Sequence, residues 1–250
     1  MLEVRDLFKS YGKMEAVKGI NFQIKPGEIF GFLGPNGAGK TTTIKICSGL
    51  LKADSGKVLI NSYDIQKEPV EAKRNLGYVP ENPYLYDRLT AREFLQLVSD
   101  IYLKDLDFHE KESRINNILE LLEMDKRADE LIGSYSKGMG RKIILAAAFL
   151  HRPKVVLLDE PTHGLDAYSA KTVKDLFRKQ ANEGSAILLT THVMEIAERL
   201  CDRIAVIYEG KIKAVGTLEQ LRQKATSKDS SLEDIFLKLT KKEETEEVAG

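Results

Sequence analysis

The stretch that decides the fold of this chain is Gly34-Pro35-Asn36-Gly37-Ala38-Gly39-Lys40-Thr41. It fits the pattern G-x-x-x-x-G-K-[S/T], in which glycines let backbone N–H groups approach phosphate oxygens. An apolar, strand-like run precedes it at 29–33, and a helix is expected from Lys40 to about Leu51. Because the start of a helix attracts anions, this order predicts a site for a nucleoside triphosphate. Lys40 would reach the β- and γ-phosphates, and the Thr41 hydroxyl would bind Mg²⁺.

The composition is that of a globular protein with balanced charge. The chain has 250 residues, 42% of them hydrophobic, and its 38 basic and 38 acidic side chains cancel. This length suits one large domain or two lobes, and zero net charge argues against a nucleic-acid partner. Cys47 and Cys201 have neither metal-ligand nor disulfide spacing, which favours a reducing cytoplasm. We expect no secretory signal and no membrane span, because no apolar run approaches the required ~20 residues.

Hydrophobic patterns predict a mixed α/β fold. Residues 2–8 and 20–24 alternate between apolar and polar side chains, which is typical of half-buried antiparallel strands. Residues 155–158 and 186–191 are largely apolar, as in a parallel sheet that is covered on both faces. We therefore expect a P-loop NTPase (RecA-like) core with an antiparallel β flank.

A helical segment interrupts this core at about 82–151, and it includes a capping box at 90–93. We expect residues 1–216 to form the nucleotide-binding domain, with this segment as an inserted α-helical subdomain. Residues 217–250 are expected to form a short C-terminal helical extension. Its charged end, from 241 onward, lacks periodicity and is expected to fray.

A second motif is expected to complete the phosphate site. Four apolar residues at 155–158 predict a buried strand, and Asp159 and Glu160 follow at its carboxyl end. Open α/β sheets bind ligands at this edge. Asp159 would bind Mg²⁺ directly or through water. Glu160 would orient, or accept a proton from, the water that attacks the γ-phosphate.

Two further motifs stand in a fixed order around Asp159-Glu160. Ser136-Lys137-Gly138-Met139 precedes this pair at the start of a helix, and His192 follows the strand at 187–191. Together with the phosphate loop, this order resembles the nucleotide-binding subunit of ABC (ATP-binding cassette) transporters, over about residues 2–216. The form Tyr-Ser-Lys-Gly-Met at 135–139 is similar to that of the exporter-like, ABC-2 type branch.

The resemblance implies a role for each matching residue. Tyr11, helped by Val17, would stack on the adenine of ATP. Glu160 would be the catalytic carboxylate, and His192 would hydrogen-bond the γ-phosphate and steady the attacking water. The phosphates of ATP would be held by Gly34, Pro35, Asn36, Gly37, Ala38, Gly39, Lys40, Thr41 and Thr42.

The same resemblance places ATP between two subunits. Ser136 and the backbone at Gly138 would reach the γ-phosphate of ATP held by the opposite subunit, since a helix N-terminus favours an anion. Asp166 would lie at the dimer interface and couple the two sites. The opposite subunit would be a second copy of this chain or a related ATP-binding subunit. Movement would pass through the segment 81–89 and the helical insert to a multi-span membrane subunit, which would hold the chain at the inner face of the cell membrane.

The chain departs from the family pattern at two places. Glu81 stands where the family usually has glutamine; a carboxylate offers only oxygen, so it could bind Mg²⁺ but could not donate an N–H to water. Tyr135, Lys137 and Met139 replace the leucine, a glycine and the glutamine of the family's LSGGQ signature. Because Ser136 and Gly138 remain, the signature is interpreted as a variant.

The resemblance thus implies an ATP-binding and ATP-hydrolysing transporter subunit, with export favoured by its signature. Two alternatives stay open at this point. One is a soluble ABC ATPase that remodels a protein assembly, such as iron–sulfur cluster assembly, without a membrane partner. The other is a metabolic P-loop kinase, against which the Ser136–Gly138 and His192 elements argue. ATP-dependent dimerisation would separate the kinase from the ABC proteins.

Overall fold

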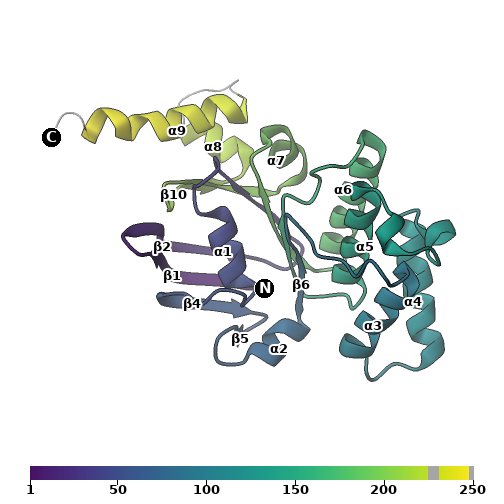
Figure 1. Ribbon diagram of the computed structural model, residues 1–250. Helices are drawn as coiled ribbons and strands as arrows, with labels where there is room; N and C mark the ends of the chain where they lie inside the picture. Colours follow the sequence, from purple (N-terminus) through teal and green to yellow (C-terminus); the bar gives the residue numbers. More distant parts are fainter. Residues whose placement is uncertain (225–230, 248–250) are drawn as a thin grey trace.

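The computed structural model describes the backbone of residues 1–224 and 231–247. Figure 1 shows two sheets, with one group of helices gathered beside the larger sheet. The strands are β1 (Leu2–Tyr11), β2 (Met14–Ile24), β3 (Ile29–Leu33), β4 (Ser55–Ile60), β5 (Tyr63–Asp64), β6 (Leu76–Val79), β7 (Val155–Asp159), β8 (Ala186–Thr191), β9 (Arg203–Tyr208) and β10 (Lys211–Gly216). The helices are α1 (Lys40–Cys47), α2 (Pro69–Arg74), α3 (Ala91–Tyr102), α4 (Phe108–Leu121), α5 (Lys137–Phe149), α6 (Ala167–Asn182), α7 (Met194–Leu200), α8 (Leu218–Lys224) and α9 (Leu232–Glu247).

One sheet is antiparallel and the other is mostly parallel, as the hydrophobic patterns predicted. The smaller sheet has the order β2-β1-β4-β5 and is antiparallel. The larger sheet has the order β10-β9-β3-β8-β7-β6, in which β10 is antiparallel and the other strands are parallel. Parallel strands put their carboxyl ends at one edge, so the loops after β3, β7 and β8 meet there.

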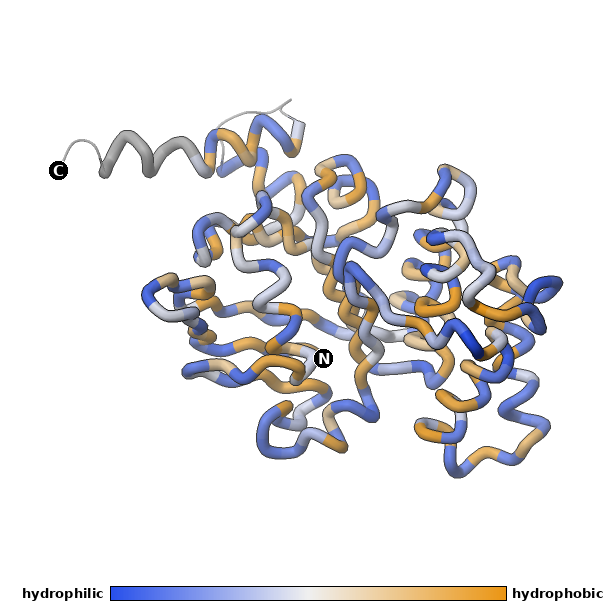
Figure 2. Tube along the Cα trace, viewed as in Figure 1, coloured by the Kyte–Doolittle hydropathy of each residue, from blue (hydrophilic) through white to orange (hydrophobic). Residues whose placement is uncertain are grey.

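Strand β7 is buried on both faces, which explains why its first four residues, 155–158, are all apolar. Val156 and Leu158 face a core shared with α3, α4, α5 and α6. Val155 and Leu157 face a second core, shared with α1 and the antiparallel sheet. Figure 2 shows the central strands as mostly hydrophobic and many loops as hydrophilic. Successive side chains of the strand thus face the two cores in turn. A shift of one residue would exchange the two faces, so this alternation fixes the register of the strand.

Helix α1 begins at Lys40 as predicted but ends at Cys47, earlier than the expected Leu51. Gly49 has a φ of 70°, and the N–H of Leu50 donates to the Lys45 carbonyl oxygen at 3.0 Å. This is a Schellman ending, in which a glycine with a left-handed backbone closes the helix. Helix α1 therefore ends early because of the backbone conformation at Gly49.

Three α-helices lie between β6 and β7 in the chain: α3, α4 and α5. The capping box of Thr90 with Glu93 is present at the start of α3, as the sequence predicted. Helix α4 begins at Phe108, where Asp107 and Glu110 form a second capping box.

The C-terminal part differs from expectation at its charged end. Helix α9 continues to Glu247, whereas fraying was expected from 241. Lysine and glutamate have high helix propensity, so a charged run can extend a helix that has already begun. Residues 248–250 lie outside the described residues. Among the helices described, none is long and apolar enough to cross a membrane.

Candidate functional site

The phosphate loop joins β3 to α1 and has no room for side chains at two of its glycines. A Cβ on Gly34 would lie 2.3 Å from the Ile207 carbonyl oxygen. A Cβ on Gly39, where φ is 104°, would lie 2.5 Å from the Ala16 carbonyl oxygen. These two glycines therefore bring the loop backbone against β2 and β9, which shapes a cradle of the kind that holds phosphate.

The other predicted phosphate-binding residues lie along the same loop and the first turn of α1. Asn36 and Gly37 are exposed at its tip, and Ala38 is buried beneath them. Pro35, Thr41 and Thr42 are half-buried. The exposed tip and the buried base together leave one side of the loop accessible to a ligand.

Lys40 is buried within this loop. Its Nζ donates to the carbonyl oxygens of Gly34 at 2.7 Å and Pro35 at 3.0 Å. Burial lowers the pKa of the Lys40 ammonium, and three nearby carboxylates oppose that effect, namely those of Glu160, Asp159 and Glu81. A buried cation beside the cradle is the group needed to bind the β- and γ-phosphates of a nucleotide.

Asp159 lies at the carboxyl end of β7, where it is almost completely buried. Thr190 Oγ1 donates to its Oδ1 at 2.5 Å, and Thr41 also hydrogen-bonds its carboxylate. Burial raises the pKa of Asp159, and the negative charges of Glu81 and Glu160 add to that effect. Such a site favours a nearby cation, because a cation would stabilise the ionised carboxylate.

The donor set fits Mg²⁺ held jointly with a nucleotide. Within the described part of the chain, no three or more His, Cys, Asp or Glu side chains are arranged to hold a metal. Mg²⁺ is commonly bound by one or two carboxylates together with phosphate oxygens and water. Asp159, the Thr41 hydroxyl and the neighbouring cradle supply such a set.

Glu160 follows β7 with a φ of 47°, in the left-handed region that few non-glycine residues adopt. Its Oε1 accepts from the backbone N–H of His192 at 2.9 Å and from His192 Nδ1 at 2.7 Å. Its Oε2 accepts from Thr191 Oγ1 at 3.2 Å. Because β7 and β8 are neighbouring parallel strands, the structure brings the predicted pair Glu160 and His192 together. Strained backbone of this kind is often found at functional sites.

The predicted signature and interface residues lie at two other helix starts. Ser136 caps α5 by accepting from the Met139 N–H at 3.2 Å, and Asp166 caps α6 by accepting from the Ser169 N–H at 2.8 Å. The hydrogen bond from the Ser169 N–H lowers the pKa of the Asp166 carboxyl. A Cβ on Gly138 would lie 3.5 Å from the Gly164 carbonyl oxygen, so the two helix starts are neighbours.

These helix starts belong to a different part of the molecule from the phosphate loop. Helix α5 packs on α3, α4 and β6, whereas α1 packs on β2 and β7. Figure 1 shows α1 and α5 on opposite sides of β6 in this view. The packing therefore associates Ser136 and Gly138 with the helical segment, and the phosphate loop with the strands.

The two residues predicted to stack on adenine have different surroundings. Tyr11 ends β1, its side chain is 47% exposed, and Lys9 Nζ lies 5.8 Å from its ring centroid. Val17 is 1% exposed and belongs to the core between the sheets, and its contact with adenine stays a prediction. The preceding residue, Ala16, is half-buried on the other face of β2, beside Gly39.

Sequence reasoning missed Arg141, which the structure places beside the carboxylates. Its guanidinium is buried and donates to the carbonyl oxygens of Pro80 and Glu81. Glu81 itself is exposed, on the segment after β6. The signal that could have identified Arg141 is a charged residue close to the apolar run at 143–149 of the same helix.

A phosphate loop that faces an acidic strand end in a parallel sheet defines a P-loop nucleoside triphosphatase. The family described as "ABC transporter" matches residues 17–163, which is more than half of the chain. The chain therefore belongs to the ABC transporter family, as an ATP-binding subunit with ATPase activity.

Relatives support this assignment over most of the chain. The chain is 41% identical to the linearmycin resistance ATP-binding protein LnrL of Bacillus subtilis, over 88% of this chain and 70% of that protein. It is 34% identical to the ABC-type transporter ATP-binding protein EcsA of the same organism, over 97% of this chain and 98% of that protein.

Solved structures agree with the fold. An ATP-binding subunit of an ABC transporter superposes with a TM-score of 0.90 at 34% identity, over 96% of this chain and 99% of that one. A dimeric ATP-binding cassette bound to ADP and Pi, in a post-hydrolysis state, superposes with a TM-score of 0.80 at 26% identity, over 87% of this chain and 99% of that one. The predicted α/β P-loop fold with an antiparallel flank is confirmed.

Proposed function

We propose that this chain powers export through a separate multi-span membrane subunit, and that it does so as a dimer that closes over ATP and Mg²⁺. Residues 1–216 would form the ATP-binding unit and residues 217–250 an extension. The observation that carries this proposal is the meeting of Lys40, Asp159, Glu160 and His192 at one edge of the sheet. These side chains supply a phosphate-binding cation, a metal ligand and a water-orienting carboxylate in one place.

Each side chain would have a distinct part in hydrolysis. Lys40 would bind the β- and γ-phosphates, while Thr41 and Asp159 would hold Mg²⁺, which neutralises phosphate charge when it is bound. Glu160 would orient the attacking water and accept its proton. His192 would keep the Glu160 carboxylate in place through the 2.7 Å contact and hydrogen-bond the γ-phosphate from its exposed ring. Loss of a general base typically lowers a rate by about 10²–10⁴.

A second copy would complete each ATP site. Ser136 caps α5 and is exposed, so the positive end of this helix is accessible to an anion outside the chain. Ser136 and the backbone of Gly138 would contact ATP held by the second copy, and Asp166 would lie at the interface between copies. The dimeric cassette bound to ADP and Pi supports this arrangement.

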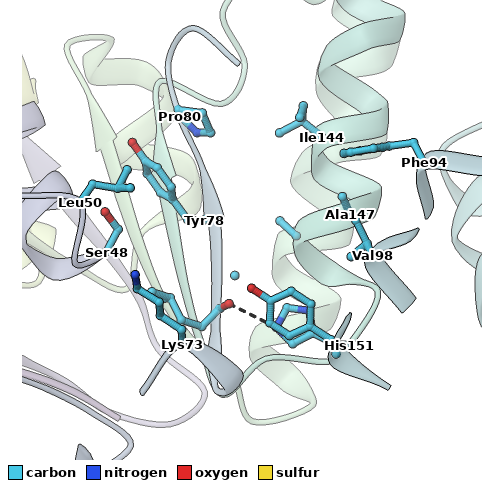
Figure 3. Close-up of a pocket in the computed structure, with 14 residues that line it drawn as sticks. Ser48, Leu50, Lys73, Tyr78, Pro80, Phe94, Val98, Ile144, Ala147 and His151 are labelled. Carbon is cyan, nitrogen blue, oxygen red and sulfur yellow. Dashed lines mark hydrogen bonds between the residues drawn. The ribbon is translucent and has the colours of Figure 1, made fainter. Parts of the chain in front are cut away.

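A groove between the helical segment and the sheets would receive the membrane subunit. Its volume is about 340 Å³, and Figure 3 shows Leu50 and Tyr78 facing Ile144 and Val98 across it. Several apolar side chains on and near it are exposed, including Leu50, Leu97, Ile101 and Tyr102. Exposed apolar clusters of this kind mark sites of protein association. A short apolar segment of the membrane subunit fits this groove, which would hold the chain at the cytoplasmic face of the membrane.

The names of the relatives favour transport over the soluble alternative. LnrL is named for linearmycin resistance, and another relative, YbhF of Escherichia coli, is named a probable multidrug ABC transporter ATP-binding protein. Both names support export as the direction of movement. A soluble ATPase that remodels a protein assembly is not favoured, since EcsA, which matches over nearly its full length, is likewise named as part of a transporter.

The test is a pull-down in mild detergent from the native cells, with the Glu160→Gln variant and Mg-ATP. We expect recovery of a multi-span membrane protein, because a dimer that cannot hydrolyse ATP should remain closed on its partner. Recovery of soluble proteins alone, with the chain absent from the membrane fraction, would contradict the transport proposal. It would leave the ATP site as described.

A further inference from the structure

Arg141 joins helix α5 to the segment that follows β6. Its Nη1 donates to the Pro80 carbonyl oxygen at 2.6 Å, and its Nη2 donates to the Glu81 carbonyl oxygen at 2.5 Å. The guanidinium is planar and presents its donors in a rigid fork. Two donors from one plane on two consecutive carbonyl oxygens fix the orientation of the peptide that carries Glu81.

The site of this contact is buried and charged. Arg141 is 5% exposed, and burial lowers its pKa. Three carboxylates oppose that effect, in decreasing order those of Glu81, Asp159 and Glu160. Because arginine stays protonated in proteins, this is a permanent positive charge beside the acidic end of β7. Lys40 lies within the influence of the same three carboxylates from the phosphate-loop side.

The contact also reaches the start of α5. Arg141 lies in the second turn of this helix, and Ser136 caps its first turn. A helix is rigid over such a distance, so a shift of the Pro80-Glu81 peptide would be passed to Ser136 through Arg141. Lys142, the next residue, points elsewhere: its Nζ lies 3.8 Å from Glu123 Oε2, at the end of α4.

We propose that Arg141 is a positioning residue that holds Glu81 toward the metal side of the ATP site and links that side to the start of α5. The inference rests on the proposed function, in which Glu81 faces Mg²⁺ and Ser136 serves the ATP of a second copy. Arg141 does not itself contact metal or phosphate. Its effect is exerted through the peptide at Glu81, and outer partners of metal ligands typically change metal affinity by about 10- to 100-fold when they are lost.

The test measures ATP binding by calorimetry as a function of Mg²⁺ concentration, in full-length Glu160→Gln protein. Arg141→Met keeps much of the side-chain length and removes every donor. We expect this variant to need about ten times more Mg²⁺ to reach half of the Mg²⁺-dependent gain in ATP affinity. Its affinity for ATP without Mg²⁺ should stay within about twofold of the affinity of the Glu160→Gln parent. We also expect faster amide hydrogen exchange over residues 80–85, where the peptide loses its anchor.

Two further variants control for folding and for general disruption of α5. Arg141→Lys keeps the charge and can donate to one carbonyl oxygen, so we expect a smaller shift in the Mg²⁺ dependence of ATP binding than for Arg141→Met. Lys142→Met removes a neighbouring cation of similar burial, 8% exposed, that does not contact Pro80 or Glu81. It is expected to leave the Mg²⁺ dependence unchanged.

A double-mutant cycle with Glu81→Ala decides between positioning and a merely structural role. If Arg141 acts through Glu81, Arg141→Met adds no further shift in the Glu81→Ala background. An undiminished shift in that background, or a wild-type Mg²⁺ dependence of Arg141→Met, would overturn the inference. Either result leaves the proposed function standing, whereas absence of ATP binding by the Glu160→Gln parent would count against the proposed function itself.

Discussion

The carboxylate of Glu160 accepts two hydrogen bonds from His192, at 2.9 Å from its backbone N–H and at 2.7 Å from its Nδ1. This pair joins the ends of two neighbouring parallel strands, and Glu160 adopts a left-handed backbone to make the contact. One residue therefore orients the other, beside a buried Lys40 and Asp159.

His192→Ala removes the side-chain hydrogen bond to Glu160 and keeps the backbone one. We expect kcat for ATP hydrolysis to fall about 10²-fold, as on loss of a single orienting donor, with KM within a few-fold. The matched control is His109→Ala, an exposed histidine on α4, which should hydrolyse ATP like wild type. Steady-state phosphate release measures both. Wild-type kcat in His192→Ala would show that Glu160 does not need this contact.

Substitution of Tyr11 should weaken ATP binding, whereas substitution of Val17 should lower the stability of the fold. Tyr11→Ala removes an exposed ring and is expected to weaken ATP binding about tenfold, since stacking on a base contributes roughly 1–3 kcal/mol. Val17→Ala should instead lower the free energy of unfolding by about 2 kcal/mol, because its side chain is buried in the core, and leave ATP affinity unchanged. Calorimetry and denaturant unfolding distinguish the two. A loss of ATP affinity in Val17→Ala at unchanged stability would instead place Val17 at the adenine.

His151 should make stability depend on pH. Burial lowers its pKa to about 4 from the ordinary value of 6.5, and its ring stacks on Tyr102 with centroids 4.2 Å apart. The unfolded chain binds a proton at His151 more readily than the folded chain does. The contribution of His151 to stability is therefore fully present above pH 6.5 and is lost as the pH drops toward 4. Between pH 6.5 and 5 the loss attributable to this residue is roughly 2 kcal/mol.

His151→Phe keeps the ring stack and removes the titration. Its free energy of unfolding should therefore lose about 2 kcal/mol less than that of wild type over the same pH interval. Urea unfolding at several pH values gives the comparison, in which acidic groups common to both proteins cancel. Parallel pH curves for the two proteins would show that folding does not lower the pKa of His151.

Leu50→Asp should disrupt the proposed docking groove without affecting ATP hydrolysis by the isolated chain. Its side chain lines the groove and is 64% exposed. Recovery of the membrane subunit should fall by about tenfold or more if Leu50 is a central contact. Phe108→Asp, which is 61% exposed on α4 outside the groove, is the matched control and should recover the subunit normally. Equal recovery with both variants would place the partner elsewhere.

Much of this site could be predicted because its motifs are continuous in sequence. The phosphate loop and the run from Val155 to Glu160 each place strand, turn and functional residue in a row, so local patterns suffice. The burial of Val17 could not be predicted from its motif, because it depends on the pairing of β2 with β1, which turns this side chain into the core between the sheets.

The partners of Arg141 could not be predicted from local pattern, because they are carbonyl oxygens about 60 residues away in the chain. Backbone acceptors have no sequence signature, so only the packing of α5 on β6 reveals this contact. The early end of α1 was in principle accessible, since Gly49 is the residue type that a Schellman ending requires.

The most direct test of the account is the rate of phosphate release by purified Glu160→Gln protein in Mg-ATP, compared with wild type. Glu195→Gln, an exposed glutamate on the neighbouring helix α7, is the matched control. We expect Glu160→Gln to retain ATP binding and to lose about 10²–10⁴ in rate, with Glu195→Gln unchanged. A wild-type rate in Glu160→Gln would contradict the role of Glu160, and with it the mechanism built on its contact with His192.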